Sequence, residues 1–125
     1  MWRKAKFCDS LVGRMEESNK KYNTVGAGWE SLVNNLHYEL LKVDPEYTVF
    51  QIKEKFGRLC FYFSNVTTDP KFVGISNKLV TRAELKSVKT CEECGSTEDN
   101  VHIKSTSSGW RKALCDCCAD KERIE

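Results

Sequence analysis

The sequence predicts an α+β fold in which helices pack on a β-hairpin or small antiparallel sheet, followed by a C-terminal module built around four cysteines. Three observations predict it. An apolar stripe with helical spacing runs through residues 26–45. Two segments rich in β-branched and aromatic residues follow at 47–53 and 58–64. Two C-x2-C pairs lie near the C-terminus. We therefore divide the chain into an α+β core, 1–88, and a cysteine module, 89–125.

Composition and charge limit the class of protein. The 125 residues are 40% hydrophobic and 30% charged, as in a folded domain, and no apolar run approaches the ~18 residues of a membrane span. The basic start lacks the unbroken apolar run of a signal peptide, so we expect a cytoplasmic protein. Residues 1–90 hold fifteen basic and ten acidic residues, whereas 91–125 hold five and eight. Only the first part is therefore suited to attract an anion.

Three helices are expected in the core. The stripe of the long helix consists of Trp29, Leu32, Val33, Leu36, Leu40 and Leu41, and Asp44-Pro45 ends this helix. An earlier helix over 3–18 would turn four apolar residues inward: Phe7, Leu11, Val12 and Met15. A third helix follows the hairpin, with Asp69 as N-cap and Pro70 at its first position. Its predicted inner stripe is Phe72, Ile75, Leu79 and Ala83.

The hairpin has one apolar and one charged face. A four-residue turn, "EKFG", pairs Ile52 with Leu59, Phe50 with Phe61 and Thr48 with Phe63, and this face is expected to be buried. The outer face then carries Val49, Gln51 and Lys53 across from Tyr62, Cys60 and Arg58.

This register places Lys53 directly opposite Arg58, and like charges in that position are destabilising. Two explanations are open. Glu54 neutralises one cation locally, or an anion completes the site. In the second case Lys53, Lys55 and Arg58 would hold phosphate, Gln51 would supply a polar amide, and Tyr62 a flat ring for a base.

The cysteine module carries the strongest motif. Cys91, Cys94, Cys115 and Cys118 form two C-x2-C pairs, the spacing of a closed tetrahedral Zn²⁺ site of structural type. An odd total of seven cysteines also favours metal and free thiols over disulfides. Cys117 could replace Cys118, and His102 could replace one thiolate, but the plain spacing favours the first four.

The rest of the module predicts a treble-clef or zinc-ribbon-like arrangement. Gly95 permits a tight knuckle, "VHIKS" and "WRKAL" can pair as a hairpin, and a helix would begin at "CDCC" and run through "ADKERI". The spacing resembles that of GATA-type fingers. Because the final helix is acidic and four thiolates with one Zn²⁺ add negative charge, nucleic-acid reading by this module is disfavoured.

Catalytic chemistry is not indicated. No Ser-His-Asp, Cys-His or carboxylate pair has a telling spacing, and the chain has only two histidines. His37, on the long helix, is expected to be a satisfied surface or boundary residue rather than a base or a ligand. We therefore expect a non-enzymatic protein.

"GWESLVNNLHYEL", "QIKEKFGRLCFYF" and "TCEECG…GWRKALCDCC" together resemble a largely uncharacterised family of small phage and prophage proteins. That family typically has a Gly-Trp helix, a QIKEKFG hairpin and a C-terminal four-cysteine module. It often has Arg where this chain has Cys60, and a small residue where this chain has Arg58. The resemblance implies a protein that acts in the cytoplasm of a host cell and takes part in host–virus interaction. It also implies a role in counter-defence, that is, in blocking a host defence system.

The function expected from these features is sequestration of a nucleotide-like anionic ligand, such as a host immune signal, on the outer hairpin face, with a homo-oligomer able to enclose it. The first alternative is a protein–protein inhibitor or adaptor of a host defence protein. The second is a zinc-finger regulator that binds nucleic acid. No membrane partner is expected.

Overall fold

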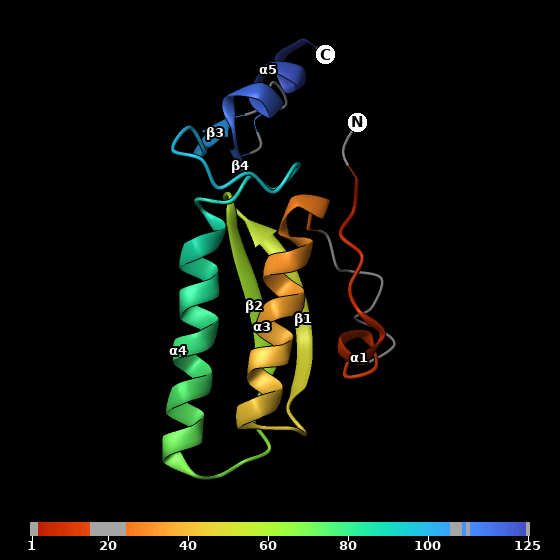
Figure 1. The fold of residues 1–125 in the computed structure, drawn as a ribbon, viewed down its shortest axis with the longest axis vertical. Helices are drawn as coiled ribbons and strands as arrows, with labels where there is room; N and C mark the ends of the chain where they lie inside the picture. The colour runs from red at the N-terminus through yellow and green to blue at the C-terminus, as the bar shows by residue number, and fades with distance from the viewer. Residues whose placement is uncertain (1–2, 16–24, 106–108, 110, 125) are drawn as a thin grey trace.

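The computed structural model describes residues 3–15, 25–105, 109 and 111–124 (Figure 1). In chain order the elements are α1 (Asp9–Val12), the 3-10 turn η1 (Ala27–Trp29), α3 (Glu30–Val43), β1 (Thr48–Lys55), β2 (Arg58–Ser64), α4 (Pro70–Ser87), β3 (His102–Ser105), β4 (Arg111–Leu114) and α5 (Asp116–Ile124). The strands form two separate antiparallel pairs, β1–β2 and β3–β4. The predicted α+β class is confirmed.

Helices α3 and α4 lie side by side and cover one face of the β1–β2 hairpin, while the cysteine module sits at the end of the hairpin that carries its turn (Figure 1). Helix α4 also closes the edge of β2. Backbone N–H groups of Leu59 and Phe61 donate to Ser87 Oγ (2.9 Å) and Glu84 Oε2 (3.0 Å). Capping by side chains satisfies strand donors that no further strand pairs with.

The long helix follows its predicted stripe. Trp29, Val33, Leu36 and Leu40 are buried, and Leu32 and Leu41 are partly buried against the same cluster. The helix proper begins at Glu30, after the 3-10 turn, and ends before Asp44. His37 differs from the expectation, because its side chain is fully buried rather than at the surface.

The helix expected over 3–18 is wrong for the described residues 3–15, since only the short α1 forms there; residues 16–18 lie outside the described part. Ala5 N donates to Val25 O (2.9 Å) and Ala27 N to Arg3 O (2.7 Å), so the start of the chain is extended beside residues 25–27. These long-range bonds replace the i→i−4 bonds of a helix. The predicted inner residues Phe7, Leu11 and Met15 are nevertheless buried.

The predicted hairpin register is also wrong. The turn has two residues, Phe56 and Gly57, both with positive φ (53° and 84°), as in the type I′ turns whose twist matches paired strands. Ile52 therefore pairs with Phe61, Glu54 with Leu59, Lys53 with Cys60 and Lys55 with Arg58. Because each pairing moves by two residues, the side chains keep their faces, and Ile52, Leu59 and Phe61 are buried as predicted.

A β-bulge between Val49 and Gln51 reverses the alternation at the start of β1. Val49 is buried, whereas Phe50, expected inside, is 46% exposed. The cause is a second neighbour of β1 at this point: Val49 forms a parallel bridge with Met15, and its N–H donates to Arg14 O (3.3 Å).

Helix α4 begins as predicted, with the Asp69 side chain accepting from Lys71 N (2.9 Å) and Pro70 in the first turn. Its inner face is different. The buried residues are Ser76, Val80, Ala83 and Ser87, so of the predicted stripe only Ala83 is fully buried. Phe72 and Ile75 are exposed because the helix is rotated to place Ser87 and Glu84 against β2.

The cysteine module forms the predicted hairpin and helix, with β3 antiparallel to β4 and α5 beginning at Asp116. Its buried apolar residues Val101, Ala113 and Leu114 belong to the same hydrophobic cluster as Trp29 and Leu59. The module therefore extends the core rather than standing apart from it. In the described part of the chain, no helix combines the length and the apolar composition that crossing a membrane requires.

Candidate metal centre and outer hairpin face

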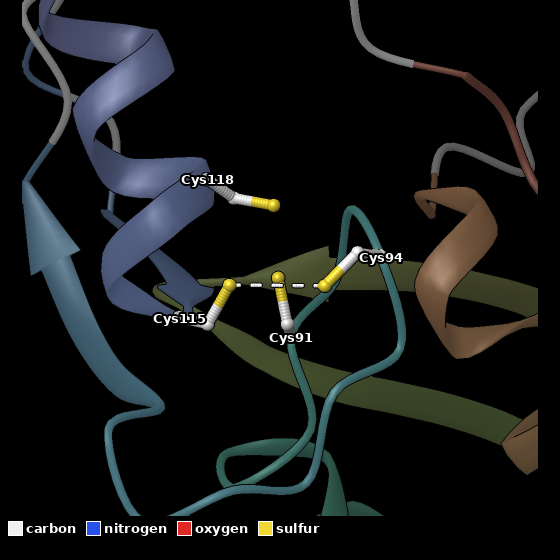
Figure 2. A group of neighbouring side chains, drawn as sticks. All are labelled: Cys91, Cys94, Cys115 and Cys118. Carbon is white, nitrogen blue, oxygen red and sulfur yellow. Dashed lines mark hydrogen bonds between the residues drawn. The ribbon is translucent and has the colours of Figure 1, made fainter.

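Four thiols converge between the knuckle after α4 and the start of α5. The Sγ atoms of Cys91, Cys94, Cys115 and Cys118 all lie within 4.8 Å of one another. Figure 2 shows the first pair coming from the knuckle loop and the second from the end of β4 and the first turn of α5, with the sulfurs pointing toward a common centre. This group could hold a metal ion.

The spacing of the sulfurs fits a tetrahedral ion. Four sulfurs at about 2.3 Å from a central metal stand about 3.8 Å apart, because a tetrahedron's edge is about 1.6 times its centre-to-vertex distance. The Cys94 and Cys115 sulfurs are 3.7 Å apart, which is also far too long for a disulfide. All seven cysteines are free thiols.

The alternative ligands do not join this group. Cys117 is exposed and lies outside the four-sulfur cluster, and His102 is exposed on β3. Cys117 follows Asp116 in the first turn of α5, one residue before Cys118. Adjacent helical positions point about 100° apart, so only one of the two can face the same centre.

The knuckle geometry is set by backbone bonds around the first pair. Gly95 N donates to Cys91 O (2.9 Å), and Cys91 N donates to Ser96 O (2.8 Å). Gly95 has φ 85°, the left-handed region that glycine occupies without steric cost. This confirms the tight turn that the sequence indicated at Gly95. On the other side, Ala119 N donates to Cys115 O (2.9 Å) and begins the helix that carries Cys118.

The knuckle also binds the loop before α3, a contact that was not predicted from the sequence. Gly28 N donates to Glu92 O (2.7 Å), Gly26 N to Glu92 Oε2 (2.9 Å), and Trp29 Nε1 to Thr90 O (2.8 Å). Burial raises the pKa of the Glu92 carboxyl to about 7. The signal in the sequence was the pair Gly26 and Gly28 next to Trp29. Glycine at position 28 permits the close approach of this loop to the backbone of the knuckle.

The outer hairpin face carries all five residues predicted to bind a ligand. Side chains of Gln51, Lys53 and Lys55 on β1 stand opposite those of Tyr62, Cys60 and Arg58 on β2. The Lys53 ammonium lies 5.5 Å from the centre of the Tyr62 ring, within cation–π range. The Tyr62 side chain is 44% exposed on this face.

The opposed cations are Lys55 and Arg58, not Lys53 and Arg58. Glu54 does not neutralise them on the outer face: it pairs with Leu59 on the inner face, and its Oε2 accepts from Gly57 N (2.7 Å). Arg58 Nη2 lies 3.8 Å from Glu84 Oε1, and both side chains are partly exposed. Ion pairs of that kind contribute little. Within the described part of the chain, Lys55 has no ion pair.

A second polar cluster joins α1, α3 and Tyr47, the residue before β1. Ser10 Oγ lies 2.9 Å from His37 Nε2, and His37 Nδ1 lies 2.6 Å from the Tyr47 hydroxyl. Burial raises the pKa of Tyr47 far above its ordinary value of 10, so the hydroxyl keeps its proton. Burial and the Arg14 charge lower the pKa of His37.

One proton arrangement gives each of these buried donors an acceptor among the described residues. Tyr47 donates to Nδ1, and the Nε2 proton of the neutral His37 ring is donated to Ser10 Oγ. In this arrangement His37 does not withdraw the Ser10 proton. The cluster resembles a nucleophile–base pair in its distances, but it acts as a hydrogen-bonded link that holds α1 on α3.

No protein-family model, no curated protein and no solved structure matches the chain.

Proposed function

We propose that the ion held by the four cysteines is Zn²⁺ and that its role is structural. Four thiolates form a closed shell with no open position for a substrate or water, the pattern of structural zinc. Zinc binding contributes roughly 10–16 kcal/mol to folding in small zinc-finger peptides. Such a contribution suits a module whose described apolar core consists mainly of Val101, Ala113 and Leu114.

We propose further that the chain is a non-enzymatic binding protein whose outer hairpin face holds a nucleotide-like anion. The observation that carries this proposal is the placement of Lys53, Lys55, Arg58 and Tyr62 on one sheet face. Helices α3 and α4 pack on the opposite face and along one edge, so they leave this face clear (Figure 1).

The chemistry of the face matches the two parts of a nucleotide. Lys55 and Arg58 stand directly across from each other at the turn end, so a phosphate between them would relieve their repulsion. Tyr62 and Gln51 form the next outer pair beyond Lys53 and Cys60, where an exposed ring can stack a base and an amide can hydrogen-bond it. Phosphate would thus lie near the turn and the base toward the middle of the strands.

This set of side chains supports sequestration of a ligand rather than its turnover. Cations, an amide and a phenol bind and orient a nucleotide, and the only metal centre among the described residues is closed by its own thiolates. The resemblance to small phage proteins makes a nucleotide signal of host immunity the natural ligand to test, with counter-defence as the role.

The test is a thermal-shift screen of the zinc-loaded protein against mono-, di- and cyclic nucleotides. A ligand at 100 times its Kd stabilises the folded state by about 2.7 kcal/mol, which raises Tm by several degrees. Lys55→Gln and Tyr62→Leu should abolish the shift. Lys42→Gln is the matched control, because Lys42 is an exposed cation on α3 already paired with Glu39 at 3.2 Å. An unchanged shift in both hairpin variants would show that the site is wrong.

One observation favours a second function, an interface to a host protein formed by the hairpin and the cysteine module. Phe56 at the hairpin turn is 68% exposed, and Ile103 on β3 is 46% exposed. The two are near each other, because a Cβ added to Gly57 would lie 3.0 Å from the Ile103 side chain. If the hairpin and the cysteine module form such an interface, the double variant Phe56→Ser/Ile103→Ser should no longer co-purify with one host protein, whereas Lys55→Gln should still do so.

A further inference from the structure

Helix α4 carries a row of cations along its solvent side. Lys71, Lys78, Arg82 and Lys86 recur at intervals of seven, four and four residues, the spacing of one helical face. All four side chains are exposed. From the first to the last the row spans about 22 Å, at about 1.5 Å per residue. The residues buried on α4, Ser76, Val80, Ala83 and Ser87, define a different face.

This row is not neutralised by the rest of the described chain. The one acidic residue inside α4 is Glu84, which is turned toward β2, where it accepts from Phe61 N and lies beside Arg58. Asp69, just before the helix, is occupied as its N-cap. None of the four cations forms an ion pair with a described residue, unlike Arg3, Lys42, Arg58 and Lys104, which all do.

The position of α4 makes the row accessible. The helix lies at one margin of the molecule, with α3 and β2 beside it and its far side uncovered by any drawn helix or strand (Figure 1). The four cations of the row therefore share one exposed face of a helix at the surface.

We infer that this row on α4, Lys71, Lys78, Arg82 and Lys86, binds the phosphate backbone of double-stranded DNA. Duplex DNA is a rod with one negative charge per about 1.7 Å of axis, so a row of about 22 Å meets many phosphates without needing an exact register. No base is read by such contacts, so binding is independent of sequence. This surface shares no residue with the outer hairpin face, and the inference is independent of the function proposed there.

Other polyanions fit the row less well. Single strands are usually held by several exposed aromatic rings that stack bases, and α4 exposes one aromatic side chain, Phe72, at the start of the row. A helix that lies in a membrane surface inserts a continuous apolar face, but Val80 and Ala83 are buried in this protein's own core. The exposed apolar side chains of α4 are Phe72, Ile75 and Leu85, and Leu85 lies at least ten residues from the other two. An α-helix fits the wide major groove of B-DNA but not the deep, narrow one of duplex RNA.

The expected binding is weak and strongly dependent on salt. Four phosphate contacts predict a slope of log K against log salt of about −3.6, which lowers affinity about 150-fold between 50 and 200 mM salt. Each cation removed should make the slope shallower by about 0.9.

The experiment is fluorescence anisotropy of a labelled 20-base-pair DNA duplex with the full, zinc-loaded chain from 50 to 200 mM salt. Lys78→Gln with Arg82→Gln should halve the slope to about −1.8, and Lys71→Gln with Lys86→Gln should do the same. Glutamine is a good helix former, so circular dichroism and zinc content should be unchanged in both pairs. Lys53→Gln with Lys55→Gln, which removes two hairpin cations, should leave the slope as it is.

Several results would overturn the inference. They are absence of binding at 50 mM salt, an unchanged slope in the α4 pairs, or an equal loss in the hairpin pair. Tighter binding to an RNA duplex of the same length, or to vesicles containing phosphatidylserine, would likewise reject DNA as the partner. Loss of nucleotide binding in the hairpin pair, with DNA binding intact, would separate this surface from the proposed ligand site.

Discussion

Replacing Gly28 with alanine should destabilise the whole chain and weaken metal binding, although residue 28 lies far from the cysteines in sequence. A Cβ at this position would lie 2.1 Å from Cys91 O, 2.6 Å from Glu92 C and 2.6 Å from Gly95 N. All three atoms are backbone, so no side chain can rotate away. Either the knuckle or the turn before α3 must move.

The magnitude follows from what that movement breaks. Overpacking against a fixed neighbour costs about 1–3 kcal/mol. Separating the two segments also removes the bond from Gly28 N to Glu92 O (2.7 Å), and a buried donor left without a partner costs about 1–3 kcal/mol. The expected loss is therefore about 2–6 kcal/mol, a large share of the 5–15 kcal/mol that stabilises a typical domain.

The assay is urea denaturation followed by tryptophan fluorescence and circular dichroism, with zinc release measured by a colorimetric chelator in the same samples. Gly74→Ala is the matched control. Gly74 lies inside α4 with no atom within 4 Å of the added Cβ, so alanine there should stabilise by about 0.5–1 kcal/mol. A Gly28→Ala protein as stable as the parent, and holding zinc as tightly, would refute the close approach of the knuckle to α3.

Four further outcomes are expected. Because the pKa of His37 is lowered by burial and by Arg14, the unfolded chain binds a proton that the folded chain does not. The free energy of unfolding is therefore highest above about pH 6.5 and falls as the pH drops below that value. In urea titrations, the free energy of unfolding should fall less between pH 7.5 and pH 5.5 in His37→Gln than in the parent chain, and an equal fall would contradict this. Asp44→Asn should cost about 1.5–3 kcal/mol in the same assay, since the buried Asp44 carboxylate accepts bonds from the loop before α4, and no cost would contradict this. Phe56→Asn should stabilise by about 0.5–1 kcal/mol, because asparagine tolerates the positive φ of the turn, and a lower Tm would argue against that turn type. Chelation of the metal should lower the Tm of the whole chain in one transition; a separate early transition confined to the cysteine module would show that the two parts unfold independently.

Features that depend on nearby residues were predictable from the sequence. The C-x2-C pairs, the Asp69-Pro70 helix start and the short hairpin between the cysteine pairs all rest on chemistry within a few positions of each other. The structure reproduces the last two and brings the four cysteines together. Four sulfurs can surround one ion with few alternative arrangements, so the spacing alone strongly limits the geometry.

Features set by contacts distant in sequence were not predictable in the same way. The turn of the main hairpin was missed because Phe56 occupies a position at which asparagine or glycine is the usual sign. The bulge at Phe50 depends on Met15 and Arg14, more than thirty residues earlier. Apolar spacing on α4 fits two faces, and the choice between them is made by the Glu84 and Ser87 contacts with β2.

The most consequential residue that the sequence analysis passed over lies inside the metal motif itself. Glu92 separates the first two cysteines, yet its backbone and carboxylate both bind the loop that begins α3, and its N–H donates to Ala113 O (2.8 Å). An ion that fixes Cys91 therefore also fixes the partner of Gly26 and Gly28. Since α3 packs against α4 and α4 packs against β2, metal bound at one end of the chain would stabilise the hairpin whose outer face we propose as the ligand site.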